Sequence, residues 1–196
     1  MQARSRCVNA PSESCGLQAA LGKGYRLIIT LTGLAVAGSA LPAQGQDRAQ
    51  RQYELKAALL YNFLKFVEWP ADTGTTRTVC VLGQDPFGSA LESIAGRTAA
   101  GRTVETKLLA RVEEVAGCHL LFISTSEADR LAQVLHVLGD SSVLTVAEMR
   151  DFARRGGMVG LSVRRNKIHL AINVEAYEQA RLKISSQLLS VASVIR

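Results

Sequence analysis

The sequence predicts a single three-layer α/β domain: a mostly parallel sheet flanked by helices, with an antiparallel hairpin at one edge and a long C-terminal helix. Three observations predict this class. Short β-prone runs alternate with helix-forming stretches from residue 78 to residue 154. Two later apolar runs are separated by only three residues, which leaves no room for a crossover helix. The last segment carries apolar residues at helical spacing.

The first predicted element is a helix over Tyr53–Trp69. In its central part only Asn62 and Lys65 are polar, so almost the whole circumference is apolar. Such a helix has to be buried in the domain or bound to a partner. Pro70 disfavours helical geometry at the residue before it, and this predicts that the helix ends there.

The remaining elements follow from alternation and spacing. The alternating region predicts strands over Thr78–Leu82, Thr103–Leu109, His119–Ser124 and Ser142–Val146, with helices over Pro86–Ala95, Val112–Ala116, Glu127–Leu138 and Ala147–Arg154. The hairpin pairs Met158–Val163 with Lys167–Asn173. The last helix is predicted over Val174–Ile195, with Asn173 as its N-cap and with one apolar stripe formed by Tyr177, Ala180, Ile184, Leu188, Val191 and Ile195.

The N-terminal region has the order of an export signal. Lys23 and Arg26 precede the apolar run Leu27–Leu41, and small residues follow it. The run is shorter than the roughly 20 residues that a membrane-spanning helix needs, although an uncleaved anchor is the alternative. We therefore expect a cleaved signal region over residues 1–45, a polar linker over 46–52 and the domain over 53–196. We expect an exported protein that is not inserted in the membrane after cleavage.

The charge of the chain argues against nucleic-acid binding. The formal net charge is +6, and three of these charges lie before the apolar run. No long Lys/Arg run remains after it, and the chain has one Trp, four Tyr and five Phe. A nucleic-acid-binding face needs a denser array of cations interleaved with aromatic residues.

Two cysteines remain after the predicted signal region. An exported protein meets an oxidising compartment, so Cys80 and Cys118 are expected to form a disulfide, with two inert buried thiols as the alternative. The three histidines stand in no short motif with carboxylates or cysteines, and we therefore predict no metal, no cofactor and no catalytic residue. The chain is expected to bind rather than to catalyse.

Two surfaces are candidates for partner binding. One is the exposed part of the first helix together with Glu68 and Trp69, and core packing of Trp69 is the alternative. The other is the hairpin tip with Arg164, Arg165 and His169, because His169 alternates with apolar neighbours and points to the opposite face. A solvated tip is the alternative there.

One loop is a candidate for ligand binding. Gly83–Gly88, with Asp85, Pro86 and Phe87, follows the first strand of the alternating region, where open α/β sheets tend to bind ligands. It lacks the spacing of a dinucleotide or phosphate loop, so an ordinary tight turn is the alternative. A small-molecule sensor of anions or nucleotides is accordingly the alternative function.

Five segments resemble, in order, the YfiR family of periplasmic proteins. They are LKAALLYNFLKFVEWP (Leu55–Pro70), CVLGQDPFG (Cys80–Gly88), CHLLFIS (Cys118–Ser124), GGMVGLSVRRNKIHLAIN (Gly156–Asn173) and RLKISSQLLSVASVI (Arg181–Ile195). The resemblance implies a repressor that binds the periplasmic portion of an inner-membrane diguanylate cyclase, which lowers cyclic di-GMP and biofilm formation.

The resemblance also implies partners and a disulfide. It implies a homodimer, and capture by an OmpA-like outer-membrane lipoprotein that releases the cyclase. Cys80 and Cys118 correspond to a disulfide pair of the family. Some relatives have a second cysteine pair near the glycine-rich turn, whereas this chain has Ala153 and Gly160 in that region. Redox control through a second bridge is therefore not expected.

Overall fold

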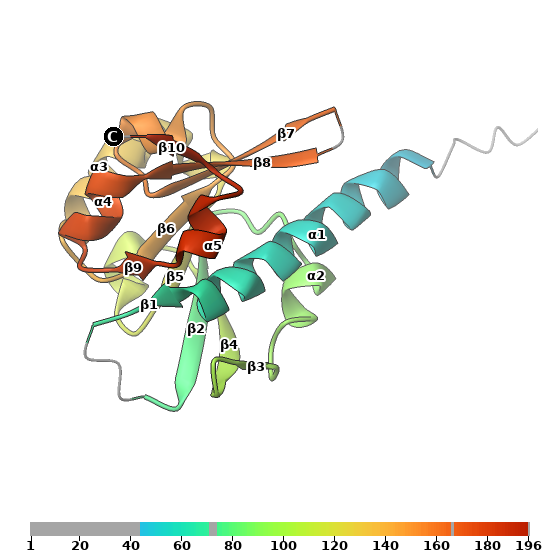
Figure 1. Cartoon of the computed structure of the whole chain (residues 1–196). Coiled ribbons are helices and arrows are strands. Elements are labelled where there is room, and N and C mark those ends of the chain that lie inside the picture. Colours follow the sequence, from blue (N-terminus) through green and yellow to red (C-terminus); the bar gives the residue numbers. More distant parts are fainter. Residues whose placement is uncertain (1–43, 71–73, 166, 196) are drawn as a thin grey trace, which may run out of the picture. The chain divides into compact units, whose positions relative to one another are not determined.

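The computed structural model describes residues 44–70, 74–165 and 167–195, and side chains from residue 49 onward (Figure 1). Residues 1–43 of the predicted signal region lie outside the described residues, and its last two residues begin α1. The helices are α1 (Gln44–Phe66), α2 (Ser89–Glu92), α3 (Leu131–Leu138), α4 (Val174–Gln179) and α5 (Ser186–Leu189), with 3-10 turns η1 (Val112–Val115), η2 (Thr125–Arg130) and η3 (Phe152–Arg155). The strands are β1 (Val67–Glu68), β2 (Thr76–Leu82), β3 (Thr98–Ala99), β4 (Arg102–Leu109), β5 (Leu120–Ile123), β6 (Leu144–Ala147), β7 (Val159–Arg164), β8 (Lys167–Asn173), β9 (Lys183–Ile184) and β10 (Ser193–Ile195).

Eight strands form one mostly parallel sheet, as predicted. Their order is β10-β8-β7-β6-β5-β2-β4-β3. The five central strands β4, β2, β5, β6 and β7 pair in parallel with one another in that order. Outside them, β3 pairs antiparallel with β4, β8 pairs antiparallel with β7, and β10 pairs parallel with β8. The chain builds β4 on one side of β2 and then crosses to β5 on the other. The strand order therefore reverses beside β2, which is where such sheets tend to form ligand crevices.

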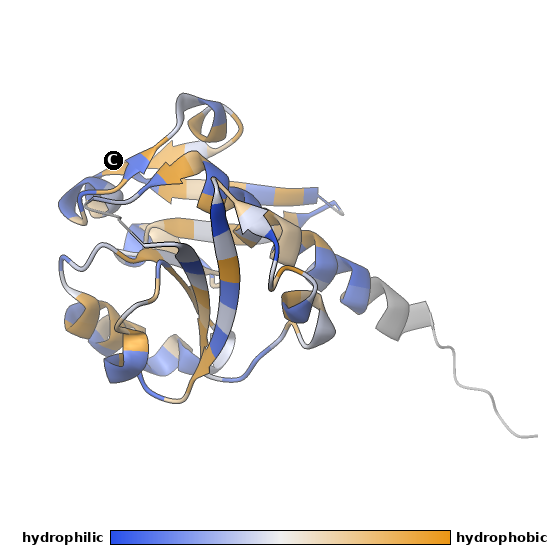
Figure 2. Ribbon diagram, turned by 90° about the horizontal axis from the view of Figure 1, so that it is seen from below, coloured by the Kyte–Doolittle hydropathy of each residue, from blue (hydrophilic) through white to orange (hydrophobic). Residues whose placement is uncertain are grey.

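Two hydrophobic cores cover the two faces of the sheet. Because side chains alternate along a strand, Val79 and Val81 of β2 enter one core, whereas Cys80 and Leu82 enter the other. The first core lies against α1, α2, α4 and α5, and the second lies against α3 and the 3-10 turns. Apolar segments run through the central strands in Figure 2. The three-layer arrangement is thus present.

The predicted long C-terminal helix is wrong. Residues Val174–Ile195 form α4, β9, α5 and β10 instead of one helix. Arg181 has a left-handed φ of 60°, which ends α4, and Ser185 caps the start of α5. The expected apolar stripe is real only in part, because Tyr177 and Leu188 are buried but Val191 is 70% exposed. Tertiary pairing decided the outcome, since β9 pairs with β1 and β10 pairs with β8.

The hairpin is present but does not form the edge of the sheet. Strands β7 and β8 pair from Val159↔Ile172 to Arg164↔Lys167. The last strand, β10, then adds parallel to β8 and becomes the outermost strand. A three-residue strand at the end of a predicted helix carries little sequence signal of its own, and its partner is 22 residues away along the chain, as the pair Ser193↔Ala171 shows.

The helical boundaries also differ from the prediction. Residues Gln46–Gln52, expected as a linker, lie in the first turns of α1, because their Gln, Arg and Ala residues favour helix even without an apolar face. The helix ends at Phe66, since Val67 and Glu68 pair with β9. The helices predicted after β2 and β6 shrink to the short α2 and η3.

Candidate functional site

Cys80 and Cys118 form a disulfide inside the second core. Cys80 lies in β2, and Cys118 lies two residues before β5, the strand that pairs with β2. The Cα atoms are 5.9 Å apart, and both side chains are buried. The bridge ties the end of the η1 segment to the centre of the sheet. It therefore fixes the connection that leads from β4 to β5.

Trp69, expected at a partner surface, belongs to the core. Its side chain is 8% exposed, and its Nε1 donates a hydrogen bond of 3.0 Å to the carbonyl oxygen of His119. The guanidinium of Arg77 lies 4.5 Å from the Trp69 ring centre, and the His119 ring meets it edge-on at 5.8 Å. Only Glu68 of this pair is exposed, on β1. The core-packing interpretation of Trp69 is the one that the structure supports.

His119 has a structural role in the same cluster. Its Nδ1 accepts a 3.1 Å hydrogen bond from the backbone N–H of Thr78, which requires that nitrogen to be unprotonated. Burial lowers the pKa of His119, and the charges of Arg77 and Arg102 lower it further. Burial also lowers the pKa of Arg77 to about 10, so its guanidinium is still charged at neutral pH.

The loop Gly83–Gly88 is an ordered turn. The carboxylate of Asp85 accepts hydrogen bonds from the backbone N–H groups of Phe87, at 2.8 Å, and Gly88, at 3.1 Å. Phe87 is buried and packs edge-on against Phe122, with ring centres 4.7 Å apart. Phe87 is thus part of the core, whereas Asp85 and Pro86 are half-buried and the Asp85 carboxylate is engaged by the loop backbone. The tight-turn interpretation of this loop explains its geometry.

A crevice does open at the same end of the sheet, although other residues form it. It encloses about 190 Å³ at the end of β2 and is lined by Leu82, Arg111, Val112, Glu113, Glu127, Arg130, Gln133 and Val134. Glu127 is nearly buried, and its carboxylate accepts a 2.5 Å hydrogen bond from Arg130. These residues come from β2, from η1 and the residue before it, and from η2 and α3. The loop that the sequence singled out lies at this end of the sheet, but the sequence carried no signal for which other loops fold over it.

A buried ion pair went unnoticed in the sequence. Lys56 of α1 is only 2% exposed, and its Nζ lies 2.5 Å from the carboxylate of Glu148, which follows β6. The same Nζ lies 4.0 Å from the ring centre of Tyr53. Burial raises the pKa of Tyr53, and the charge of Glu148 raises it further. A signal was available, because Lys56 precedes the buried Leu60 by four residues and so lies on the buried face of the helix.

The hairpin residues Arg164, Arg165 and His169 are exposed, as expected. Arg164 lies directly opposite Lys167, and His169 lies opposite Ser162. Figure 1 shows the tip of the β7–β8 hairpin extending alongside the N-terminal half of α1, whereas β1 follows the C-terminal end of that helix. The structure therefore does not join Glu68 and the hairpin cations into one surface.

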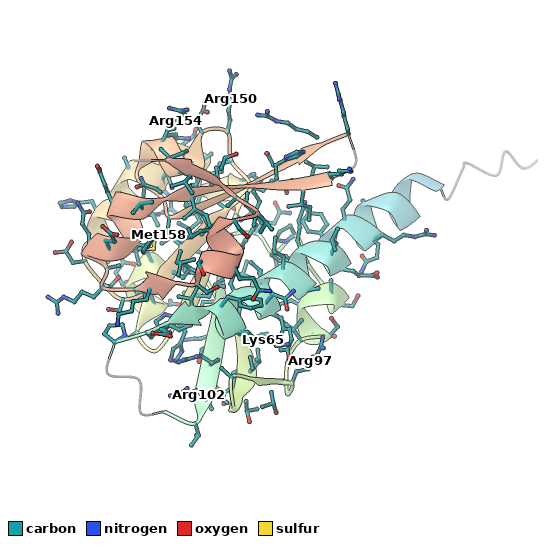
Figure 3. All side chains as sticks on the ribbon, in the orientation of Figure 1. Lys65, Arg97, Arg102, Arg150, Arg154 and Met158 are labelled. Carbon is teal, nitrogen blue, oxygen red and sulfur yellow. A yellow bond between two sulfur atoms is a disulfide. The ribbon has the colours of Figure 1, made fainter. Side chains whose placement is uncertain are left out.

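The solvent side of α1 forms a continuous stripe. Its members recur every three or four residues, and they are Arg51, Leu55, Ala58, Asn62 and Lys65. Leu55 is 56% exposed, so more than half of this apolar side chain faces solvent. The Nζ of Lys65 lies over the ring of Tyr61 at 4.4 Å. Figure 3 shows Lys65 beside Arg97, which stacks on the same ring from the loop before β3.

Within the described part of the chain, His, Cys, Asp and Glu side chains do not gather in threes as a metal site would require. None of the helices described is both long and apolar enough to span a bilayer.

Comparison with known proteins identifies the family. No curated protein matches the chain in sequence. Among solved structures, a conserved domain protein from Vibrio cholerae aligns with 74% of this chain at 12% identity and a TM-score of 0.48. An ABC domain in complex with L-Trp from Streptococcus pneumonia aligns with 76% at 16% identity and a TM-score of 0.46. The chain spans 60% of the length of each. The sequence profile of the YfiR/HmsC-like family matches residues 53–193, and the chain therefore belongs to this family.

Proposed function

We propose that the protein is a periplasmic binding protein that represses an inner-membrane diguanylate cyclase by binding its periplasmic portion, which lowers cyclic di-GMP and biofilm formation. Membership of the YfiR/HmsC-like family is the observation that carries this proposal. It supports a role in regulating diguanylate cyclase signalling. Repression requires that the protein bind the inactive conformation of the cyclase more tightly than the active one, because that difference alone shifts the equilibrium.

The solvent stripe of α1 is the surface that we assign to the cyclase. Its exposed Leu55 supplies an apolar contact between the polar residues Arg51 and Asn62, and Glu68 extends the surface beyond the end of the helix. Apolar anchors surrounded by polar residues are typical of protein interfaces. A helix that is pinned to the core by Phe63 and Leu64 presents this stripe without having to fold on binding.

A pull-down tests the function and the surface together. Residues 46–196 are immobilised and mixed with the periplasmic portion of the candidate cyclase, with and without reductant. We expect binding under oxidising conditions and loss of binding on reduction if the Cys80–Cys118 bridge shapes the bound form. Leu55→Glu should weaken binding at least about tenfold, because it places a charge in an apolar contact. Val191→Glu, at a 70% exposed site, is the matched control.

Two results would contradict the proposal. One is a lack of binding in both redox conditions. The other is an unchanged level of cyclic di-GMP after deletion of the gene in cells that possess the cyclase. If Val191→Glu weakens binding as much as Leu55→Glu, the repressor function stands but the assigned surface is wrong. Homodimer formation and capture by an OmpA-like outer-membrane lipoprotein remain proposals that the same immobilised domain can test.

The crevice at the end of β2 favours a second candidate function, a small-molecule sensor. Its cations Arg111 and Arg130 stand beside the carboxylates of Glu113 and Glu127 above an apolar floor, which is the mixture found in ligand sites. A ligand that binds only the folded state raises the melting temperature. A thermal-shift screen of anions and nucleotides at millimolar concentration therefore tests it, and no shift for any of them would count against a sensor.

A further inference from the structure

The positive charge of the domain is concentrated in one segment. Between Glu148 and Lys167 there are six Arg or Lys residues and two carboxylates. In the rest of the chain from residue 46 onward, thirteen Arg or Lys residues stand against fourteen Asp or Glu residues. One of the two carboxylates in the segment, Glu148, is already paired with the buried Lys56. The whole cationic excess therefore belongs to η3 and the β7–β8 hairpin.

These cations share one side of the sheet. A Cβ on Gly160 of β7 would lie 3.6 Å from the backbone N of Ala153 in η3, so the side of β7 to which position 160 points is the side that carries η3. Because side chains alternate, Arg164 points to that same side, as do its cross-strand neighbour Lys167 and, two residues further, His169. Figure 3 shows Arg150 and Arg154 projecting from the side of the molecule on which the hairpin lies.

The arrangement at the hairpin tip is costly for the free protein. Arg164 and Lys167 lie directly opposite each other, and like charges in such a pair destabilise a hairpin. Arg165, between them in the chain, has a φ of 48°, which is uncommon for a residue with a side chain. An anionic partner that contacts the tip would offset the repulsion between these cations.

We propose that the hairpin tip docks on a membrane surface of anionic phospholipid headgroups. The tip protrudes beside α1 (Figure 1), so it can touch a flat surface. Arg164, Arg165 and Lys167 are exposed and, among the described residues, form no ion pair with a carboxylate. Long cationic side chains of this kind suit a surface of many mobile anions, because that attraction needs no defined geometry. Docking there holds the domain at the membrane in which the proposed partner is embedded. This membrane docking is a second binding activity, separate from the proposed repression of the cyclase.

Vesicle sedimentation tests this inference. The protein is mixed with vesicles of phosphatidylcholine alone or of phosphatidylcholine with phosphatidylglycerol, at low and high salt. The test variant is Arg164→Gln/Arg165→Gln/Lys167→Gln. The control, Lys107→Gln/Arg181→Gln/Lys183→Gln, removes three exposed cations elsewhere. All proteins keep the same N-terminus, so any contribution of the leader to vesicle binding is the same in each. Their melting temperatures are compared to show that the variants are folded.

We expect the wild type and the control to prefer phosphatidylglycerol vesicles and to dissociate at high salt. The hairpin variant should bind these vesicles at least about tenfold more weakly, since each cation near such a surface contributes about fivefold. Equal binding by the two variants, or no preference of the wild type for phosphatidylglycerol, would overturn the inference. If the hairpin variant binds the vesicles as well as the wild type does but no longer binds the cyclase in the pull-down, the tip contacts an acidic protein surface instead. Neither result depends on whether the Leu55 surface binds the cyclase.

Discussion

Removing the Cys80–Cys118 bridge should destabilise the domain strongly. The two residues are separated by 38 positions, and the bridge closes a loop of that length. Chain-entropy reasoning gives a stabilisation of about 4 kcal/mol for such a loop, because the unfolded chain loses conformational freedom when it is cross-linked. Small domains are stable by roughly 5–15 kcal/mol, so this loss is a large part of the total.

The assay is equilibrium unfolding in urea, followed by far-UV circular dichroism. The free energy of unfolding of Cys80→Ala/Cys118→Ala should be about 4 kcal/mol lower than that of the oxidised wild type. The wild type in reductant is the matched control, because it keeps both buried side chains and loses only the covalent bond. It should agree with the double variant within about 1.5 kcal/mol. A loss below about 1 kcal/mol in both samples would refute the entropic reasoning.

Three further perturbations follow from buried groups. Glu148→Gln should lower the free energy of unfolding in urea by about 3 kcal/mol, because it leaves the Lys56 ammonium buried without a counter-charge. Lys56→Met should stay within about 1 kcal/mol of the wild type, because it removes the buried charge itself. Equal losses for the two variants would contradict this reasoning. Burial lowers the pKa of His119, so as the pH falls the unfolded chain binds a proton at this side chain before the folded chain does. Stability should therefore fall as the pH decreases below about 6.5, and His119→Gln should flatten that slope. An unchanged slope in urea unfolding at several pH values would show that other groups cause it. Gly83→Ala should lower the stability by about 2 kcal/mol or more, because φ at this position is 87° and the new Cβ would collide with Ser126. An unchanged melting temperature would show that the loop can shift to accommodate the methyl group.

Local sequence patterns predicted the elements whose residues interact with near neighbours. The strand Lys167–Asn173 has the predicted bounds, and the strand over Thr78–Leu82 is present with two more residues at its start. In both, β-prone residues are flanked by turn residues, so the local preference agrees with the sheet that contains them. The spacing between β7 and β8 permitted only a hairpin, and a hairpin forms.

The C-terminal segment shows where local patterns fail. Tyr177 and Leu188 have helical spacing because both reach the first core, but they do so from two separate helices with β9 between them. Ile184 pairs with Val67, a residue more than 100 positions away along the chain. Periodicity over a window cannot detect such a partner.

The candidate functional residues show the same division between what the sequence determined and what the tertiary structure decided. By itself the sequence determined the charge of the hairpin, the cysteine pair and the family, because each of these is carried by residues that are close together or by their order along the chain. Only the tertiary structure decided that Trp69 is core, that Lys56 is buried with Glu148, and that the crevice is lined by Arg111 and Glu127. Burial and long-range pairing depend on which distant segments pack together, and a linear pattern does not contain that information.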